Sequence, residues 1–95
     1  LLPFVKKLEE IFEEPFTEDT RLGILIHMGC LIDRLTKKQA SAVNFNLDSI
    51  RTKYHDEFTM VSEASKKLES TFNVTFSDSD KATIIEIIIN NKRRN

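Results

Sequence analysis

The chain is poor in the residues that cross-link, bend or interrupt a backbone. Its 95 residues include one cysteine, two glycines and two prolines, and no tryptophan. A single cysteine forms no internal disulfide, so a disulfide-built scaffold is excluded, and so few turn-forming residues argue against a sandwich of many short strands. The 40% of hydrophobic and 31% of charged residues are ordinary for a globular protein. We therefore expect a single domain over residues 1–95, which needs only a hydrophobic core to fold.

The chain also lacks an excess of charge and a long apolar run. A formal net charge of −1 argues against a domain whose task is to neutralise nucleic-acid phosphates, so we expect no direct nucleic-acid contact. No apolar segment is long enough to span a bilayer, so we expect no membrane contact. Together with the lone thiol, this favours a cytoplasmic protein. Because Leu1 already lies in a helical pattern, we expect the chain to be a fragment of a longer polypeptide.

Residue patterns of familiar catalytic and metal sites are missing. His27 and His55 lie 28 residues apart without a nearby pair of ligands, so no metal site is predicted. There is no glycine-rich phosphate loop, no serine on a nucleophile elbow and no cysteine paired with a histidine. We therefore expect a non-enzymatic domain with no catalytic residues and no cofactor.

Hydrophobic residues recur every three to four positions in most of the chain. This period predicts an all-α, compact bundle of four principal helices over residues 3–14, 18–35, 56–72 and 78–91, with a short fifth helix near 47–53. The isoleucines between Ile84 and Ile89 favour a strand by propensity, but the capping residues from Ser77 to Asp80 favour a helix. Val43 and Phe45 are candidates for anchoring the loop before the short helix to the core. We find no internal repeat.

His27 is the residue that best fits a chemical role. On a helical wheel it lies near Gly23 and Arg34 and opposite the main apolar stripe, and its ring should project over Gly23, which has no side chain to cover it. A neutral imidazole nitrogen is available there at cellular pH, as a phosphoryl acceptor requires. A plain histidine at the edge of the core is the alternative. His55, just before a helix, is predicted to be a solvated first-turn residue.

Three motifs resemble those of the phosphotransferase-system regulation domain, the PRD, and together span nearly the whole chain. They are Leu25-x-His27-x-x-x-x-Ile32-Asp33-Arg34, Tyr54-x-x-Glu57-Phe58-x-x-Val61-x-x-Ala64 followed by Leu68 and Phe72, and Phe76-Ser77-Asp78. The run from Ile26 to Arg34 is most similar to the levanase-regulator branch of transcriptional activators. In the family's last helix, Lys81 and Ile88 stand where a Glu and a second histidine are usual.

The resemblance implies a regulatory module of a bacterial transcriptional regulator of carbohydrate uptake or use. Such a module is controlled by phosphotransferase-system phosphorylation on a histidine and acts through dimerisation or domain packing. The resemblance assigns phosphorylation to His27, with Arg34 as a phosphate or network partner. It implies the phosphocarrier protein, sugar-specific enzyme II components and a second copy in a homodimer as partners. The alternative is a non-phosphorylated structural helical module for dimerisation or interaction.

Overall fold

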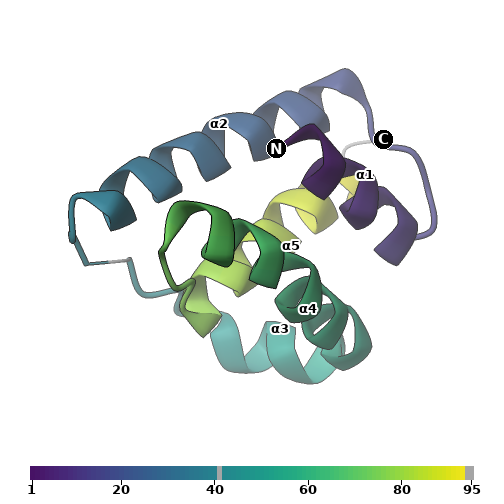
Figure 1. The fold of residues 1–95 in the computed structure, drawn as a ribbon. Helices are drawn as coiled ribbons and strands as arrows, with labels where there is room; N and C mark the ends of the chain where they lie inside the picture. The colour runs from purple at the N-terminus through teal and green to yellow at the C-terminus, as the bar shows by residue number, and fades with distance from the viewer. Residues whose placement is uncertain (41, 94–95) are drawn as a thin grey trace.

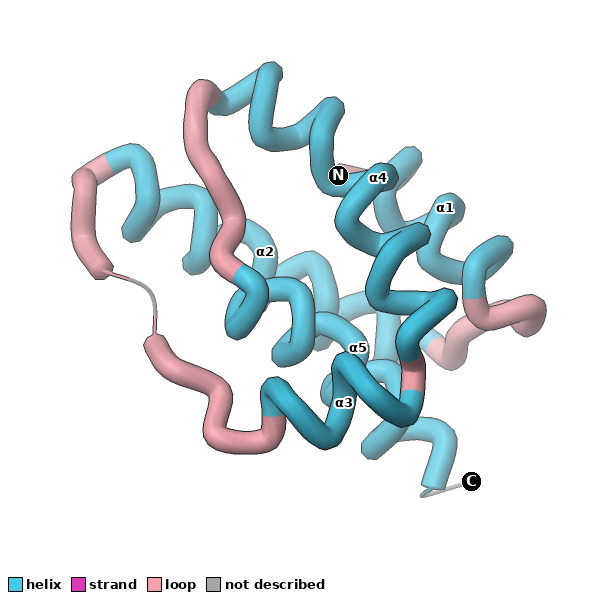
Figure 2. The backbone as a smooth tube through the Cα atoms, turned by 90° about the horizontal axis from the view of Figure 1, so that it is seen from below, coloured by secondary structure: helices cyan, strands magenta, loops and turns pink. Residues whose placement is uncertain are grey.

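The described residues form five helices. The computed structural model describes residues 1–40 and 42–93, with side chains through residue 91. The helices are α1 (Leu2–Ile11), α2 (Glu18–Thr36), α3 (Leu47–Lys53), α4 (His55–Phe72) and α5 (Asp78–Arg93), shown in Figure 1. In Figure 2 only helices and loops appear along this part of the chain, which confirms the all-α prediction and the short additional helix. None of these described helices is both long and apolar enough to cross a membrane.

The isoleucine-rich segment is helical, as predicted. Ile84, Ile85 and Ile88 are all buried in α5, so the β-branched side chains fill the core of the domain. The first helix, in contrast, ends at Ile11 and not at residue 14. Glu13 adopts a left-handed conformation with φ of 58°, and Pro15 disfavours helical backbone in the residue before it. The apolar period therefore continues slightly beyond the point at which the backbone leaves the helix.

The helices pack in pairs around one core. α1 packs against α4, α2 packs against α5, and α3 lies against both α4 and α5. The least exposed large side chains come from four helices, and they are Leu8, Ile24, Met28, Leu31, Val61, Ile84, Ile85 and Ile88.

The helices that follow each other in the chain, α1–α2 and α4–α5, form two helical hairpins with the same hydrogen bonds at equivalent positions. This structural repeat corrects our prediction of no internal repeat. In the first pair the Phe16 backbone N–H donates to Glu9 Oε2 at 2.7 Å. In the second pair, 60 residues later, the Phe76 backbone N–H donates to Glu69 Oε2 at 2.8 Å. Both phenylalanines are buried. A glutamate near the end of one helix thus binds the backbone N–H of a buried aromatic residue that leads into the next.

The same 60-residue offset holds along the connecting loops. Glu13 and Asn73 both have left-handed backbones, with φ of 58° and 53°. Thr17 Oγ1 accepts a hydrogen bond from the Thr20 N–H at 3.2 Å. Equivalently, Ser77 Oγ accepts one from the Asp80 N–H at 3.1 Å. Each helix of the first pair also packs against its counterpart in the second. The domain therefore contains two equivalent helical hairpins, with α3 inserted between them.

The loop before α3 is held by polar contacts. Contrary to our prediction, Val43 and Phe45 do not anchor it, because both side chains are exposed and that of Phe45 is 96% exposed. The side-chain amides of Asn44 and Asn46 instead donate to Glu86 on α5, at 3.3 and 2.9 Å.

Candidate functional site

His27 lies in the middle of α2 and is half-buried. One turn earlier, a Cβ built on Gly23 would lie 3.9 Å from Cγ2 of Ile87 on α5. The face of α2 that carries Gly23 is therefore turned toward α5, which packs beside it in Figure 1. We predicted an accessible ring above an uncovered glycine; Ile87 lies against that glycine, and both Gly23 and His27 are half-buried.

Two polar atoms in this region have no partner. Nε2 of His27 and Nε of Arg34 are the only buried side-chain nitrogen or oxygen atoms without a hydrogen bond in the described part of the chain. Buried polar atoms are nearly always paired, because leaving one unpaired costs about 1–3 kcal/mol. Both of these unsatisfied donors or acceptors belong to the residues that the sequence singled out. His27 Nε2 and Arg34 Nε are therefore the buried atoms to which an additional polar group could supply a missing hydrogen bond.

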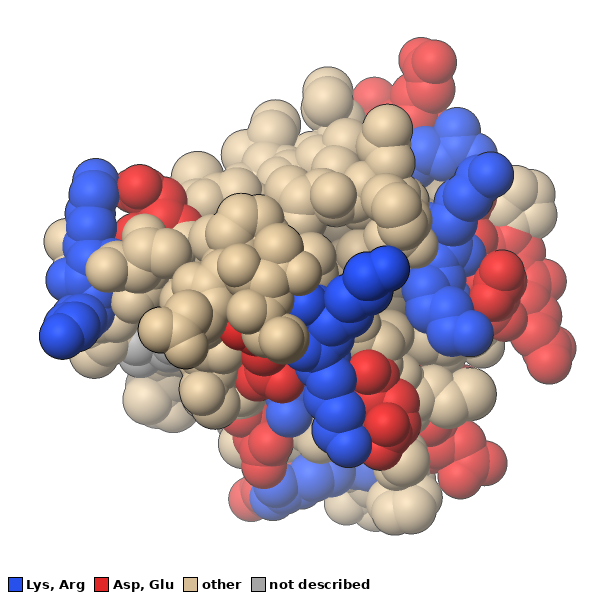
Figure 3. Space-filling view, in the orientation of Figure 1, with Lys and Arg blue, Asp and Glu red and all other residues tan. Residues whose placement is uncertain are grey.

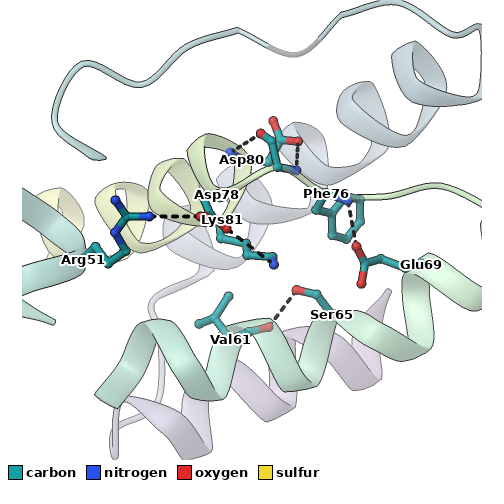
Figure 4. A network of polar contacts seen from close by, with 9 residues as sticks. Arg51, Val61, Ser65, Glu69, Phe76, Asp78, Asp80 and Lys81 are labelled. Carbon is teal, nitrogen blue, oxygen red and sulfur yellow. Dashed lines mark hydrogen bonds and ion pairs between the residues drawn. The ribbon is translucent and has the colours of Figure 1, made fainter. Parts of the chain in front are cut away.

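Asp80 is the site residue that sequence reasoning did not connect with His27. It lies in the first turn of α5 and is only 5% exposed. Its Oδ2 accepts the Ser77 backbone N–H at 2.9 Å, while its own N–H donates to Ser77 Oγ at 3.1 Å (Figure 4). This reciprocal capping box lies within the segment from Ser77 to Asp80, in which the sequence predicted capping residues. The capping pattern located the start of α5, but it gave no information about which residues of α2 lie near Asp80.

The surroundings of His27 favour its neutral form. Burial is the main effect that lowers the pKa of His27 below its ordinary value of 6.5, because a charged imidazole is poorly solvated there. The positive charge of Arg34 lowers this pKa further, and the negative charge of Asp80 opposes both effects. The imidazole is therefore neutral near pH 7 and keeps a lone pair on one ring nitrogen.

Arg34 has no ion pair with any described residue. Its sequence neighbour Asp33 pairs with Lys37 at 3.1 Å. Arg34 is half-buried and close enough to affect the pKa of His27. Its guanidinium thus remains available to an anion, and a planar fork of donors suits the oxygens of a phosphoryl group.

The positions expected for a second histidine site do not form one. Lys81 lies 3.9 Å from Asp78 in an ion pair, and Ile88 is 1% exposed within the core. On α5, Ile87 lies against the face of α2 that carries Gly23, and it is the counterpart of His27 at the 60-residue offset. Neither Ile87 nor Ile88 provides a titratable group.

The other histidine lies outside the site. His55 Nδ1 is 3.5 Å from Asp56 Oδ1, and both side chains are largely exposed in the first turn of α4. This confirms the prediction of a solvated first-turn residue. Among the described residues no group of three or more His, Cys, Asp or Glu side chains is placed to hold a metal ion.

Comparison with protein families identifies the family to which the chain belongs. A family model described as PRD domain matches residues 3–91, so the chain belongs to the PRD family, as its motifs indicated. Members of this family are regulatory modules controlled by the phosphotransferase system. The match does not distinguish the levanase-regulator branch from the others. Searches of curated proteins and of solved structures gave no match.

Proposed function

We propose that this domain is the regulatory module of a bacterial transcriptional regulator of carbohydrate uptake or use, and that His27 is its phosphorylation site. The observation that carries the proposal is the neutral, half-buried imidazole near Arg34, with an unpartnered nitrogen on each residue. The partners are cytoplasmic: the phosphocarrier protein or a sugar-specific enzyme II component of the phosphotransferase system.

The chemistry is a transfer between two histidines. A neutral nitrogen of His27 attacks the phosphorus of a phosphohistidine on the donor, so that a new N–P bond forms while the donor's N–P bond breaks. Arg34 then pairs with the phosphoryl oxygens through charge-assisted hydrogen bonds. Because Nε2 is buried, transfer to that nitrogen requires the ring to move outward or α2 to separate slightly from α5.

The charges around the ring give phosphorylation a structural consequence. A phosphoryl group adds about two negative charges and three acceptor oxygens beside Asp80, which is buried at the start of α5. Repulsion between these charges weakens the packing of α2 on α5, whereas attraction holds the phosphoryl group near Arg34. Phosphorylation thus changes how α2 packs against α5. This change alters the association of the domain or its contacts with attached domains.

The proposal is tested by phosphorylation with purified components. The chain is incubated with enzyme I, the phosphocarrier protein and labelled phosphoenolpyruvate, and an acid-labile, base-stable label is measured. We expect the label on the wild type and on His55→Gln, which changes an exposed histidine, and its loss in His27→Gln. A label that survives His27→Gln would place the acceptor elsewhere.

A purely structural module is the second candidate, and the burial of Nε2 and the lack of a second histidine favour it. In that case His27 is a packed edge residue and the domain serves only for association. No label on the wild-type chain, when a control PRD is labelled by the same mixture and by the enzyme II components, would establish this candidate over the first.

A further inference from the structure

An open groove follows the line along which α1 and α4 pack. Two cavities of about 430 and 440 Å³ lie along it, and they are continuous because Ile11 of α1 and Met60 of α4 line both. The two helices lie side by side in Figure 2. None of the described lining residues belongs to α2, so the groove is separate from the candidate site around His27.

The floor of the groove is apolar and has the length of a short helix. Ile11 is buried beneath it, Phe12 and Ala64 are half-buried, and Met60 is 42% exposed. A methionine side chain is flexible and polarisable, so it adapts to the shape of a partner. From Tyr54 to Ala64 the groove follows α4 over about 15 Å, which accommodates two to three turns of another helix. The shape therefore suits a helix that lays an apolar face between α1 and α4.

The rim of the groove includes carboxylates that have no basic partner. Figure 3 shows red atoms next to blue ones over much of the surface, as expected where acidic side chains have basic neighbours. Glu10 on the rim follows this arrangement, since it lies 3.4 Å from Lys7. The side chains of Glu13 and Glu57, in contrast, form no hydrogen bond or ion pair with any described residue, although both line the same cavity.

Glu13 also lies where its charge is unfavourable for this domain alone. It follows the end of α1 at Ile11, and the last turn of α1 contains no basic residue. The carbonyl end of a helix carries a partial negative charge, so a carboxylate there is repelled and a cation is attracted. Glu57 lies in the first turn of α4, where the helix dipole favours its ionised form. A cation from a partner would therefore interact favourably with both carboxylates and with the end of α1.

We propose that the groove between α1 and α4 is the docking site for an amphipathic helix of a partner protein, with lysine or arginine on its polar face. The apolar side chains of this helix cover Met60, and its cations pair with Glu13 and Glu57. A helix with acidic residues at these places would be repelled, so the charge of the rim selects the partner. The inference goes beyond the proposed phosphorylation and does not depend on it, because the groove lies outside the site of His27.

A model peptide tests the charge preference without any phosphate donor. The probe is a peptide of about 18 residues made of leucine and lysine, with leucines at every third or fourth position. A peptide with glutamate in place of lysine is its control. In calorimetric titration of the 95-residue chain we expect one leucine–lysine peptide to bind per chain and the leucine–glutamate peptide not to bind. Equal binding of both peptides, or no binding of the basic one, would overturn the proposal.

Two double variants separate the groove from the overall charge. Glu13→Gln with Glu57→Gln should weaken binding of the basic peptide about fivefold, since each partly exposed ion pair contributes modestly. Glu18→Gln with Asp19→Asn removes the same number of charges at the start of α2, outside the groove, and should change the dissociation constant by less than about twofold. Equal weakening in the two double variants would mean that the peptide responds only to net charge, which would contradict the proposed site.

The exposed methionine tests the apolar floor. Met60→Ser should weaken binding of the basic peptide about tenfold, because the variant has less apolar surface to bury. Phe45→Ser is the matched control, since it removes a side chain that is 96% exposed and lies outside the groove. It should leave the dissociation constant unchanged. A loss of binding in Phe45→Ser but not in Met60→Ser would place the contact on the loop before α3 and would refute the proposal.

NMR shift changes on addition of the basic peptide show directly where it binds. We expect the largest changes at the methyl groups of Ile11 and Met60 and at the backbone of the first turns of α4. Changes centred on α2 would contradict the proposed groove. Circular dichroism and thermal melting verify that each variant used in the titrations is folded.

Discussion

The α1–α2 and α4–α5 hairpins have the same local construction and different functional side chains. In each, a glutamate binds the backbone N–H of a buried phenylalanine, and a hydroxyl caps the next helix. At one pair of equivalent positions, however, the first hairpin has His27 and the second has Ile87. Local hydrogen bonds thus fix the shape of the hairpin, and the side chains between the hairpins decide whether it carries chemistry.

The two hairpins also contribute different groups to the site: His27 and Arg34 come from the first hairpin and Asp80 from the second. At the third position after the cap, the first hairpin has the buried Thr20, whose hydroxyl lies 3.0 Å from that of Thr17. The second hairpin has Asp80 at this position, which adds a negative charge. The candidate acceptor therefore comes from one hairpin and the charge that opposes its neutral form from the other, so the site exists only when both are packed together.

The largest effect is expected when a histidine replaces Ile88, where the family usually has its second histidine, in comparison with Ile87, the counterpart of His27. Ile88→His removes a core isoleucine that is 1% exposed and buries an imidazole, so the free energy of unfolding should fall by about 3–5 kcal/mol. Ile87→His replaces a half-buried residue on the face toward α2 and should cost about 1 kcal/mol. Urea unfolding of both variants measures the difference. Equal losses would mean that Ile87 is not the counterpart of His27.

The next effect compares two equivalent aliphatic residues, Leu25 and Ile85. Ile85 is fully buried, so Ile85→Ala should destabilise the domain by about 3 kcal/mol, near the middle of the range for such truncations. Leu25 is only half-buried, so Leu25→Ala should cost about 1–2 kcal/mol. Chemical denaturation monitored by circular dichroism provides both values. A larger loss for Leu25→Ala would show that the first hairpin contributes more to the core than its burial indicates.

A smaller effect concerns the glutamate of the first hairpin. The pKa of Glu9 is lowered, first by the hydrogen bond from the Phe16 backbone N–H and then by that from Arg21. The unfolded chain therefore takes up a proton before the folded one, so the stabilisation present at neutral pH is lost as the pH falls through the Glu9 pKa range. Melting temperatures between pH 7 and pH 3 should decline less in Glu9→Gln than in the wild type. An identical decline would show that the Glu9 contacts do not contribute.

The smallest effect is a shift in the pKa of His27, followed by NMR titration. Arg34→Met removes a positive charge and should raise this pKa, whereas Asp80→Asn removes a negative charge, keeps a capping oxygen and should lower it further. Since the pKa is lowered in the folded state, stability should decrease as the pH falls below 6.5, and Arg34→Met should reduce that decrease. Shifts opposite in sign would mean that these residues do not face the ring.

The sequence alone determined the helices, and it indicated the candidate site residue. Periodicity located α1, α2 and α4, and the capping residues from Ser77 to Asp80 decided the isoleucine segment in favour of a helix. These features depend on residues within one or two turns of each other, so they can be read along the chain. The motif around His27 likewise indicated the family that the comparison then confirmed.

The tertiary structure decided what each helix face meets. A helical wheel shows that His27 lies off the apolar stripe, but it treats the helix as isolated and cannot show α5 against Gly23 or Asp80 near the ring. The repeat is not evident in the sequence, because equivalent residues such as Thr17 and Ser77 have the same structural role but are different amino acids. Phe45 reads as a core residue in the sequence, yet neighbouring asparagines hold its loop on the surface. Short-range patterns record local geometry, whereas burial and electrostatics depend on residues that meet only after the chain has folded.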